Sequence, residues 1–459
     1  MLYERLFRHA LFPAYETLLK RRGTVGYMAD YQASQWLSSA ALAELQLLKL
    51  NALLGYCWAH VPFLQDHWRA AGCRPGALGD VAELASYPTL TKALVTANYA
   101  DMVARPWRGR TLAKMTSGST GEPFRCEYTM EAYARRTAVM WRGYGWGGAA
   151  LGTRTAYLWG SGMRAAGWGA VKDRLYHAAF NRCFFDAMSI SDANIDARIA
   201  AMQRYRPQAL VGYVSPVLLL ARRMLTTGER VPGLRAVLTG AEALHDPERE
   251  LIEQAFACPV FNTYGSREVM LMAAECEQHA GLHANADHLL LETLDASGSP
   301  VPAGSSGAVA VTDFHNHAMP LVRYLNGDAA SFATHACPCG RCLPLLASVD
   351  GRELDLIVAP DGRQLPGEIF VIVMNGWPDV RQWQVVQTAV DALLFRTVSA
   401  VPWTADRVER LEREVRAVSG TSMRIEICAV NDIGLAPSGK RRLTVSLTHA
   451  AQFANRAGV

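Results

Sequence analysis

The stretch Met115-Thr116-Ser117-Gly118-Ser119-Thr120-Gly121-Glu122-Pro123 is the most informative part of the chain, because it alternates hydroxyl side chains with glycines. The glycines can adopt positive φ and turn N–H groups inward, and the hydroxyls add donors to an anion. No Lys-Ser or Lys-Thr pair follows, and the pattern is not GxGxxG, which disfavours a Walker loop and a dinucleotide fold. The stretch indicates a nucleotide phosphate site. An ordinary Ser/Gly surface loop has the same composition, so segments downstream must decide.

Length and composition bound the class of protein. The chain has 459 residues, of which 50% are hydrophobic and 19% charged, and its formal net charge is +4. This length suits about two or three globular domains, and the small charge gives no sign of a nucleic-acid surface. The start lacks the apolar core of a signal peptide, and no apolar run reaches the roughly 20 residues of a membrane-spanning helix. We therefore expect a cytoplasmic protein.

Short apolar runs alternate with helical patterns in the middle of the chain, which predicts an α/β fold with sheets flanked by helices. The expected strands are 155–159, 209–213, 236–240 and 259–263, and the expected helices include 196–205 and 216–225. Three further runs, 289–294, 307–312 and 320–324, predict an antiparallel β subdomain.

The expected boundaries separate a helical segment at 1–75, a core at 76–351 and a C-terminal domain at 352–459. The last part mixes a helix at 405–418 with strands at 424–428 and 443–447, which is enough for a small α+β domain. Near the start, Lys20-Arg21-Arg22 follows Leu18 and Leu19. This cluster fits a solvated helix end, contact with an anionic membrane, or contact with a partner. The leucine-rich first helices also offer a surface for a homodimer.

Two groups of Cys and His stand out among the 10 cysteines. They are Cys276-Glu-Gln-His279-Ala-Gly-Leu-His283 and Cys337-Pro-Cys339-Gly-Arg-Cys342. Both read as loops, and together they supply the four soft ligands that a tetrahedral structural zinc requires. The alternative is a metal-free loop, because thiols in the cytoplasm are kept reduced and need not have any structural role.

The order of five motifs resembles the acyl-adenylate-forming superfamily and, within it, the phenylacetate-CoA ligase family. The motifs are the Ser/Thr/Gly loop, Thr263-Tyr-Gly-Ser-Arg-Glu268, Tyr324-Leu-Asn-Gly-Asp328, Gly351-Arg352 and Pro437-Ser-Gly-Lys440. Members associated with capsular and exopolysaccharide loci resemble this chain in the Arg before the glutamate and in the long helical start. The resemblance covers nearly the whole chain. It implies a large N-terminal adenylate-forming domain and a small C-terminal lid domain that rotates between two half-reactions.

The resemblance also implies the chemistry and its residues. A carboxylate attacks the α-phosphate of ATP, pyrophosphate leaves, and the acyl group passes to a thiol, expected to be that of coenzyme A. Lys440 would contact the α-phosphate and the carboxylate, and Glu268 would bind Mg²⁺. The other implied positions are Thr116, Ser117, Gly118, Ser119, Thr120 and Gly121 for the phosphates, Gly240, Ala241, Glu242, Tyr264 and Gly265 around adenine, and Asp328 and Arg352 for the ribose.

Some members of this family bind zinc. By that resemblance the ligands here would be Cys276, His283, Cys337 and Cys339, with His279 and Cys342 as substitutes for one of them.

The chain departs from the family pattern at three places. Arg267 stands where the family usually has Thr, so a permanent cation lies beside the metal; it would either assist the charge on the leaving group or mark a changed substrate. Leu354 stands where the hinge commonly has an acidic residue, and Phe124 follows Pro123 where a Lys is often found. The altered hinge would affect how the lid pivots.

Three classes of function follow. The first is an acyl-adenylate-forming ligase that makes a thioester of a small carboxylic acid with coenzyme A. The second hands the acyl group to a carrier protein, an amine or a sugar hydroxyl, and the third is a non-catalytic nucleotide-binding protein of a polysaccharide pathway. An aromatic acid would suit the aromatic side chains of the core, although Trp and Tyr are as often structural. The candidates are Trp141, Tyr144, Trp146, Trp159 and Tyr213.

Overall fold

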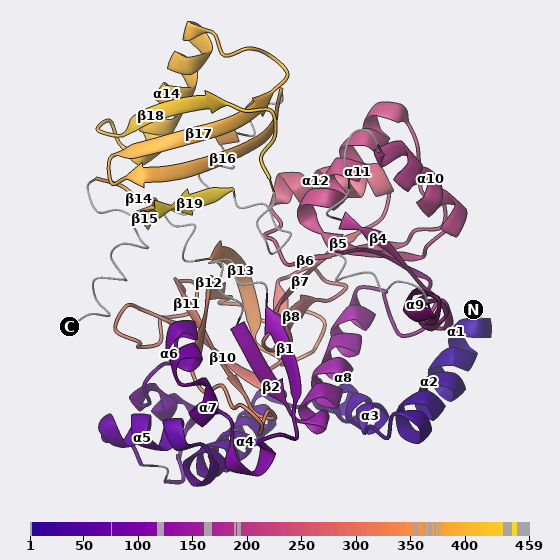
Figure 1. The fold of residues 1–459 in the computed structure, drawn as a ribbon, viewed down its shortest axis with the longest axis vertical. Coiled ribbons are helices and arrows are strands. Elements are labelled where there is room, and N and C mark those ends of the chain that lie inside the picture. The colour runs from indigo at the N-terminus through magenta and orange to yellow at the C-terminus, as the bar shows by residue number, and fades with distance from the viewer. Residues whose placement is uncertain are drawn as a thin grey trace. The chain divides into compact units, whose positions relative to one another are not determined.

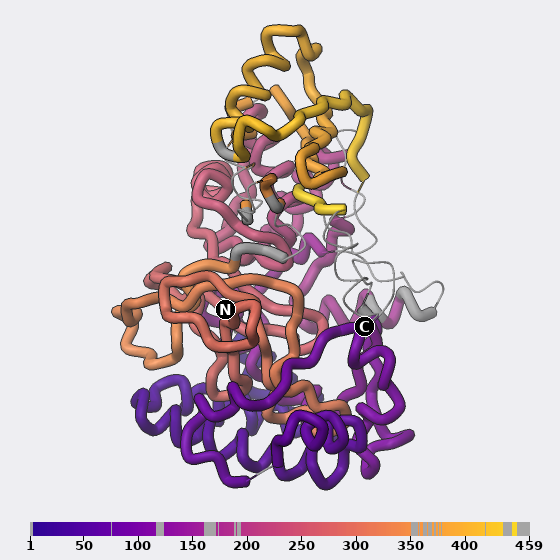
Figure 2. Tube along the Cα trace, turned by 90° about the vertical axis from the view of Figure 1, so that its left-hand side faces the viewer, coloured from indigo at the N-terminus to yellow at the C-terminus, as the bar shows by residue number. Residues whose placement is uncertain are grey.

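The computed structural model describes residues 2–74, 76–116, 124–159, 168–187, 190, 194–352, 357–360, 364–365, 370, 373–374, 376–377, 379–434 and 443–447. Contacts divide the chain into two compact units (Figures 1 and 2). The large unit comprises Met1–Asn326 and Ala330–Val349, and the small unit comprises Gly327–Ala329 and Asp350–Val459. The three-part division at 75 and 351 stays a prediction.

Helices form the start of the large unit, as the sequence predicts. The run from Leu2 to Leu19 is continuous and contains two π-helical turns. The Ser38 hydroxyl caps α4 by accepting a hydrogen bond from the N–H of Ala41 at 3.2 Å. The Thr91 hydroxyl caps α6 in the same way by accepting from the N–H of Leu94 at 3.1 Å. These elements are α1 (Leu2–Leu6), η1 (Phe7–Leu11), α2 (Phe12–Ala14), η2 (Tyr15–Leu19), α3 (Thr24–Ser34), α4 (Ser39–His60), α5 (Pro62–Ala70), η3 (Val81–Ser86), α6 (Lys92–Ala97), α7 (Tyr99–Met102) and η4 (Arg105–Trp107).

An 11-stranded sheet in the order β10-β11-β12-β13-β9-β8-β7-β6-β5-β3-β4 organises the large unit (Figure 1). The pairs β4–β3, β3–β5, β5–β6 and β6–β7 are parallel. The pairs β7–β8, β8–β9, β9–β13 and β10–β11 are antiparallel. The strands are β3 (Thr155–Trp159), β4 (Arg182–Asp186), β5 (Ala209–Tyr213), β6 (Ala236–Gly240), β7 (Val260–Ser266), β8 (Met270–Glu275), β9 (Leu282–Ala284), β10 (Leu289–Leu294), β11 (Ser306–Asp313), β12 (Tyr324–Phe332) and β13 (Leu345–Arg352).

Helices cover the parallel half of this sheet. Side chains of α10, α11 and α12, such as Ile199, Val217 and Ile252, share one buried cluster with β3, β5 and β6. The helices of this part are α8 (Met130–Trp146), α9 (Trp168–Ala179), α10 (Ile195–Tyr205), α11 (Val214–Thr227) and α12 (Asp246–Phe256). The predicted α/β class with flanking helices and an antiparallel part is confirmed.

One expected strand is wrong in its extent. The sequence predicts a strand at 320–324, but β12 begins only at Tyr324. Arg323 has φ +49, which a regular strand does not accommodate, and its buried guanidinium donates to the carbonyls of Tyr87 at 2.6 Å and Gly298 at 2.7 Å. The apolar run before it is therefore a turn anchored by a buried cation.

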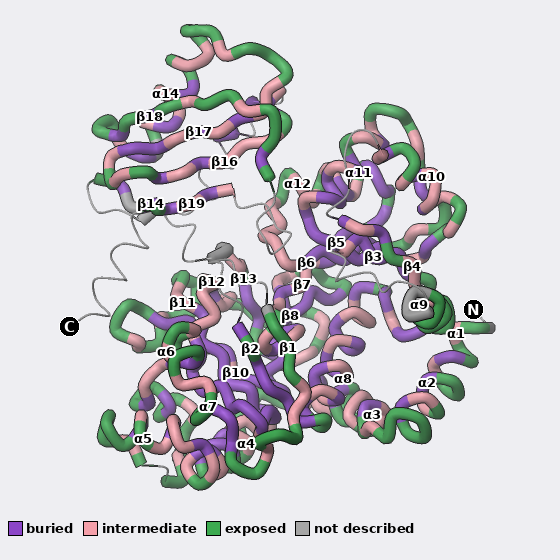
Figure 3. Tube along the Cα trace, viewed as in Figure 1, coloured by how far each residue is buried: buried purple, intermediate pink, exposed green. Residues whose placement is uncertain are grey.

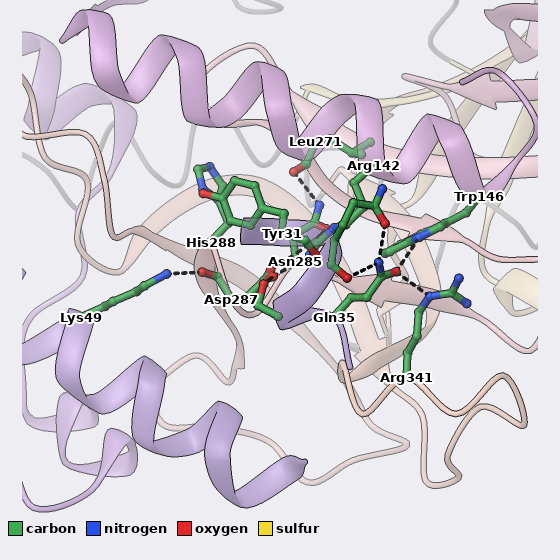
Figure 4. Close-up of polar contacts among 12 residues, drawn as sticks. Tyr31, Gln35, Lys49, Arg142, Trp146, Leu271, Asn285, Asp287, His288 and Arg341 are labelled. Carbon is green, nitrogen blue, oxygen red and sulfur yellow. Dashed lines mark hydrogen bonds and ion pairs between the residues drawn. The ribbon is translucent and has the colours of Figure 1, made fainter. Parts of the chain in front are cut away.

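A buried ion pair joins the first helices to the sheet (Figure 4). Arg142 of α8 and Asp287, which follows β9, have side-chain exposures of 1% and 0%. The guanidinium donates to the two carboxylate oxygens at 2.5 and 2.8 Å, to the side-chain carbonyl of Asn285 at 2.6 Å and to the backbone carbonyl of Tyr31 at 2.9 Å. Burial acts to raise the pKa of Asp287, but Arg142, with the Ser34 hydroxyl and His288, outweighs burial and lowers that pKa. The pair therefore stays charged in the core.

Further hydrogen bonds extend this network to α3 and α4. The Ser34 hydroxyl donates to Asp287, and the Lys49 ammonium donates to the backbone carbonyl of Asp287 at 2.6 Å. The Tyr31 hydroxyl contacts Nδ1 of His288 at 2.7 Å, and burial lowers the pKa of His288 to about 3. That imidazole is therefore neutral at physiological pH.

The small unit is an α+β domain, as the sequence predicts. Its sheet has the order β18-β17-β16-β19, and Leu411 and Val415 of α14 share a buried cluster with Phe395 of β17. The elements are β14 (Ile357–Val358), β15 (Gln364–Leu365), β16 (Val380–Ala389), β17 (Ala392–Ser399), α14 (Ala405–Ser419), β18 (Arg424–Ala429) and β19 (Thr444–Ser446).

Among the helices that the structure describes, none has both the length and the apolar character needed to cross a lipid bilayer.

The ion pair generates a stability prediction. Arg142→Met should destabilise the large unit by about 3–5 kcal/mol, because it leaves the Asp287 charge buried without its partner. Arg69→Met is the matched control: it removes an ion pair with Asp66 whose side chains are 56% and 73% exposed, and should cost about 0–1 kcal/mol. Urea unfolding monitored by tryptophan fluorescence measures both. Equal unfolding midpoints for the two variants would contradict the importance assigned to the buried pair.

Candidate active site and metal centre

A β-hairpin carries the Ser/Thr/Gly stretch. Strands β1 (Leu112–Thr116) and β2 (Phe124–Tyr128) are antiparallel, and their register places Thr116 opposite Phe124. The stretch is thus the connection between two paired strands. The backbone of Thr116 is described, whereas Ser117, Gly118, Ser119, Thr120 and Gly121 lie outside the described residues.

The turn that carries Arg267 and Glu268 joins β7 to β8 and has an irregular backbone. The register between these strands shifts after Tyr264, and Met270 has φ +68. A Cβ atom on Gly265 would lie 2.0 Å from the carbonyl oxygen of Met270, so only glycine fits there. Glu268 is half-buried and Arg267 is exposed.

Two side chains hold this turn from the protein interior. The Tyr128 hydroxyl of β2 donates to the backbone carbonyl of Glu268 at 2.7 Å. The Arg136 guanidinium of α8 donates to the carbonyl of Arg267 at 2.8 Å and stacks over the Tyr128 ring at 4.5 Å. Both contacts are made to backbone carbonyls, so neither contact restrains the side chain of Arg267 or of Glu268. Sequence reasoning missed Tyr128 and Arg136, which belong to no motif.

Arg267 connects this turn to the hairpin. Its Nη1 donates at 3.0 Å to the backbone carbonyl of Met115, the first residue of the Ser/Thr/Gly stretch. Two motifs that are 152 positions apart in the chain therefore meet. Glu268 and the start of the stretch lie on the same side of the large unit because of this contact.

A third motif meets the same strand. The side-chain amide of Asn326 in β12 donates to the Tyr264 hydroxyl at 2.8 Å, and the Tyr264 side chain is only 7% exposed. The ring of Tyr324 stacks on Phe124 of β2 with centroids 5.7 Å apart. The sequence motif singled out Asp328, which lies in the part of β12 that groups with the small unit, and missed the role of Asn326.

The segment Gly240-Ala241-Glu242 ends β6 beside β7. A Cβ atom on Gly240 would lie 2.5 Å from Oγ1 of Thr263, and Ala241 has φ +68. The Glu242 carboxylate accepts a hydrogen bond from the N–H of Ser215 at 2.6 Å, in the first turn of α11. A carboxylate at this end of a helix stabilises it through the helix dipole. Glu242 thus has a structural partner besides any ligand.

Two of the five aromatic candidates lie where parallel α/β sheets bind ligands. Trp159 and Tyr213 end β3 and β5, and their rings are 4.4 Å apart. The carboxyl ends of parallel strands are the usual ligand-binding edge. Trp141 instead packs with Phe7 and Phe12 of the first helices, and Trp146 lies against His283 with centroids 5.7 Å apart. Tyr144 packs on the core beneath β5 and β6.

The hinge and lysine motifs are described only in part. Arg352 lies at the end of β13 with its backbone described, while Leu354 and Lys440 lie outside the described residues.

The two Cys/His groups form one cluster. The ligand atoms of Cys276, His283, Cys337 and Cys339 all lie within 4.8 Å of one another. Cys276 Sγ is 3.6 Å from Cys337 Sγ, and Cys339 Sγ is 3.3 Å from His283 Nε2. Thiolates bound to zinc at about 2.3 Å in a tetrahedron lie roughly 3.8 Å apart, so the arrangement fits a metal of that geometry. The exposed Cys342 and His279, which contacts Glu275 at 3.4 Å, lie outside the cluster.

The surroundings favour the metal-binding forms of His283 and Cys339. The His283 ring contacts the carbonyl of Leu343 through Nδ1 at 3.3 Å, which places the hydrogen on Nδ1 and leaves the Nε2 lone pair facing the thiols. Burial lowers the pKa of His283, so the ring is neutral. Burial acts to raise the pKa of the Cys339 thiol, but hydrogen bonds from Arg341, Cys337 and Cys276 together outweigh burial and lower that pKa. Burial raises the pKa of Cys337, and it raises the pKa of Cys276 to about 12, so these two thiols would lose their protons on binding a metal. Neutral imidazole and thiolate are the forms that bind metals.

The chain is similar to several known proteins. No family model matches it. It is 23% identical to the phenylacetate-coenzyme A ligase of Thermus thermophilus over 435 residues, covering 88% of this chain and 96% of the relative. It is 24% identical to protein CapK of Staphylococcus aureus over 284 residues, covering 59% and 60%. Among solved structures, 2-hydroxyisobutyryl-CoA ligase in the postadenylation state with R3-HIB-AMP matches with a TM-score of 0.73 at 20% identity, covering 92% of this chain and 93% of that one. That structural likeness establishes the fold.

The irregular turn generates a prediction about Gly265. Gly265→Ala should destabilise the large unit by about 1–3 kcal/mol, because the added methyl group meets a backbone carbonyl that cannot move without shifting β8. Gly55→Ala is the matched control, since Gly55 is exposed within α4 and no atom lies within 4 Å of the place that its methyl group would take; it should stabilise by about 0.5–1 kcal/mol. Thermal unfolding measures both variants. A neutral Gly265→Ala would show that the turn adjusts freely.

Proposed function

Because the chain is similar to phenylacetate-coenzyme A ligases over most of its length and has the fold of adenylate-forming ligases, we propose that it activates a carboxylic acid with ATP and transfers the acyl group to coenzyme A. The observation that carries the proposal is the hydrogen bond from Arg267 to the Met115 carbonyl. This bond links the first residue of the stretch that we propose as the phosphate donor to the turn whose carboxylate, Glu268, we propose as the Mg²⁺ ligand.

In the first half-reaction, a carboxylate oxygen of the acid bonds to the α-phosphorus of ATP, and the bond from that phosphorus to the bridging oxygen breaks, releasing pyrophosphate. Glu268 would hold Mg²⁺, which neutralises charge on the phosphates when bound. Arg267 would add a permanent cation next to the leaving group. Lys440 is assigned by resemblance the role of neutralising the α-phosphate and the attacking carboxylate together.

In the second half-reaction, the thiol of coenzyme A gives up its proton to solvent and its sulfur bonds to the acyl carbon. The bond from that carbon to the phosphate oxygen breaks, and AMP leaves. Each part of the bound nucleotide has proposed partners. The donors from Thr116 to Gly121 would bind the phosphates, and Asp328 and Arg352 would bind the ribose. The base pocket would be formed by Tyr264, Gly240, Ala241, Glu242 and Gly265. Burial and the bond from Asn326 fix the Tyr264 ring in one position. A fixed ring is what a base needs as a stacking surface, since no rotamer freedom is lost on binding.

The acid itself is proposed to bind near Trp159 and Tyr213. These rings end neighbouring strands at the edge of the sheet where ligands bind, and they favour an aromatic or other flat acid over a short aliphatic one.

Exchange of labelled pyrophosphate into ATP, with a panel of aryl, fatty and amino acids, tests the proposed activity. An accepted acid should support exchange, and Lys440→Ala should lower that exchange by about two to three orders of magnitude while ATP still binds. Arg424→Ala, an exposed cation of the same unit paired with Asp391, is the matched control and should leave exchange unchanged. Exchange by Lys440→Ala at the parental rate would contradict the assignment of the lysine, and no exchange with any acid would favour a non-catalytic nucleotide-binding protein.

We propose in addition that Cys276, His283, Cys337 and Cys339 bind one structural Zn²⁺. All four positions of a tetrahedron would then be filled by protein, which leaves none for water or substrate. The metal would fasten the loop after β8 to the loop before β13.

The zinc proposal predicts about one zinc per chain by elemental analysis of purified protein. Cys337→Ser should lose the metal and lower the melting temperature more than it lowers adenylation by the surviving folded protein, because the ion supports structure. Cys342→Ser, an exposed thiol outside the cluster, should keep both metal and melting temperature. Metal-free protein of full stability would overturn the proposal.

A further inference from the structure

The first helical run exposes apolar side chains that no site described above uses. The buried side chains of Leu2–Leu19 are Phe7, Phe12 and Glu16. The residues on the other sides of the run include four exposed leucines. Their exposures are 50% for Leu6, 43% for Leu11, 77% for Leu18 and 72% for Leu19. A surface helix in water carries polar side chains at such positions, so this exposure indicates a contact surface.

Helix α9 continues the same surface. The rings of Tyr15 and Tyr176 lie 6.1 Å apart, and the Tyr3 hydroxyl donates to the carbonyl of Ala179 at 2.5 Å. Figure 3 shows α9 beside α1 with exposed residues along both. α9 exposes Val171 at 47% and Leu175 at 66%. Half of the large apolar side chains that are exposed in the described chain belong to these two segments. We call their exposed side chains the basic apolar face.

The charges on this face are mainly positive. Glu4 is paired with Arg8 at 2.9 Å, and the buried Glu16 accepts from Thr24 at 2.5 Å, so neither carboxylate offsets the exposed cations. The Lys20 ammonium lies over the Tyr15 ring at 5.6 Å, which keeps it beside the exposed leucines. The exposed cations of the face are Arg5, Lys20, Arg21, Lys172 and Arg174.

We propose that the basic apolar face docks the protein on the surface of an anionic lipid bilayer. Leucines would enter the boundary between headgroups and acyl chains, and the surrounding cations would face anionic headgroups, which is the pattern of interfacial helices. A second copy of the chain is a poorer occupant, because a two-fold contact would bring these cations against each other.

The proposal is independent of the ligase function. None of the residues proposed for ATP, acid, Mg²⁺ or Zn²⁺ belongs to the basic apolar face, so substitutions on it should leave pyrophosphate exchange unchanged. Each cation near an anionic bilayer strengthens binding about fivefold, and the effect falls as salt rises.

Co-sedimentation of the full-length protein with vesicles tests the proposal. The protein should pellet with vesicles of about one third phosphatidylserine in phosphatidylcholine, much less with phosphatidylcholine alone, and less with rising salt. The double variant Leu18→Glu/Leu19→Glu should bind more than about tenfold more weakly, because it loses two apolar side chains and gains two negative charges. Leu48→Glu, a leucine 69% exposed on α4, is the matched control and should bind like the parent.

The outcomes separate the alternatives. The double variant should keep the parental melting temperature, since both leucines are mostly exposed. No binding to anionic vesicles, or equal binding by the double variant, would overturn the proposal. Sedimentation velocity without lipid measures the oligomeric state of the parent and of the double variant. If the parent is a dimer and the double variant a monomer, this face binds a second copy of the chain, and the lipid proposal is overturned.

Discussion

The ion pair between Arg142 and Asp287 positions both candidate sites, because α8 supplies the arginine and also reaches each site. Arg136, six residues before Arg142, holds the carbonyl of Arg267, and Trp146, four residues after it, packs on His283. A charged pair of almost zero exposure depends on hydrogen bonds to its own groups. Asn285 and Tyr31 accept from the terminal nitrogens of Arg142, and Ser34 donates to Asp287, whereas Nε of Arg142 is buried without a partner. The orientation of α8 is therefore set by directional contacts rather than by apolar packing alone.

The elements most accessible to sequence reasoning were those buried on both faces. Strands β3, β5 and β6 begin and end where the apolar runs do, since a parallel sheet covered by helices leaves no polar alternation to blur the signal. The two Cys/His groups were visible from their short spacings, and the resemblance selected the four residues that the structure brings together, with His279 and Cys342 as the substitutes that it leaves outside. The turn with Glu268 was found through its motif.

The remaining parts depend on contacts that leave no local pattern. Nothing near Arg142 in the sequence distinguishes a buried arginine from a solvated one, and its partner is 145 positions away. The same holds for Tyr128 and Arg136, whose function is to hold backbone carbonyls of a distant turn. The run at 320–323 misled because apolar residues fit a turn as well as a strand once Arg323 adopts positive φ. The resemblance supplied the proposed nucleotide positions as a set, and the structure adds Asn326 as the hydrogen-bond partner of one of them, Tyr264.

The spacing of the metal cluster has a consequence for the order in which the chain is assembled. Cys276 and Cys337 are 61 positions apart, and β9, β10, β11 and β12 all lie between them. During synthesis the first pair of ligands emerges well before the second, so the cluster closes only after most of the antiparallel strands are available. A link across a segment of this length, if it persists in the unfolded chain, lowers the conformational entropy of that chain and so stabilises the folded state by about 4 kcal/mol. An ion bound there would stabilise the antiparallel strands after they have paired, and would not be needed to start their pairing.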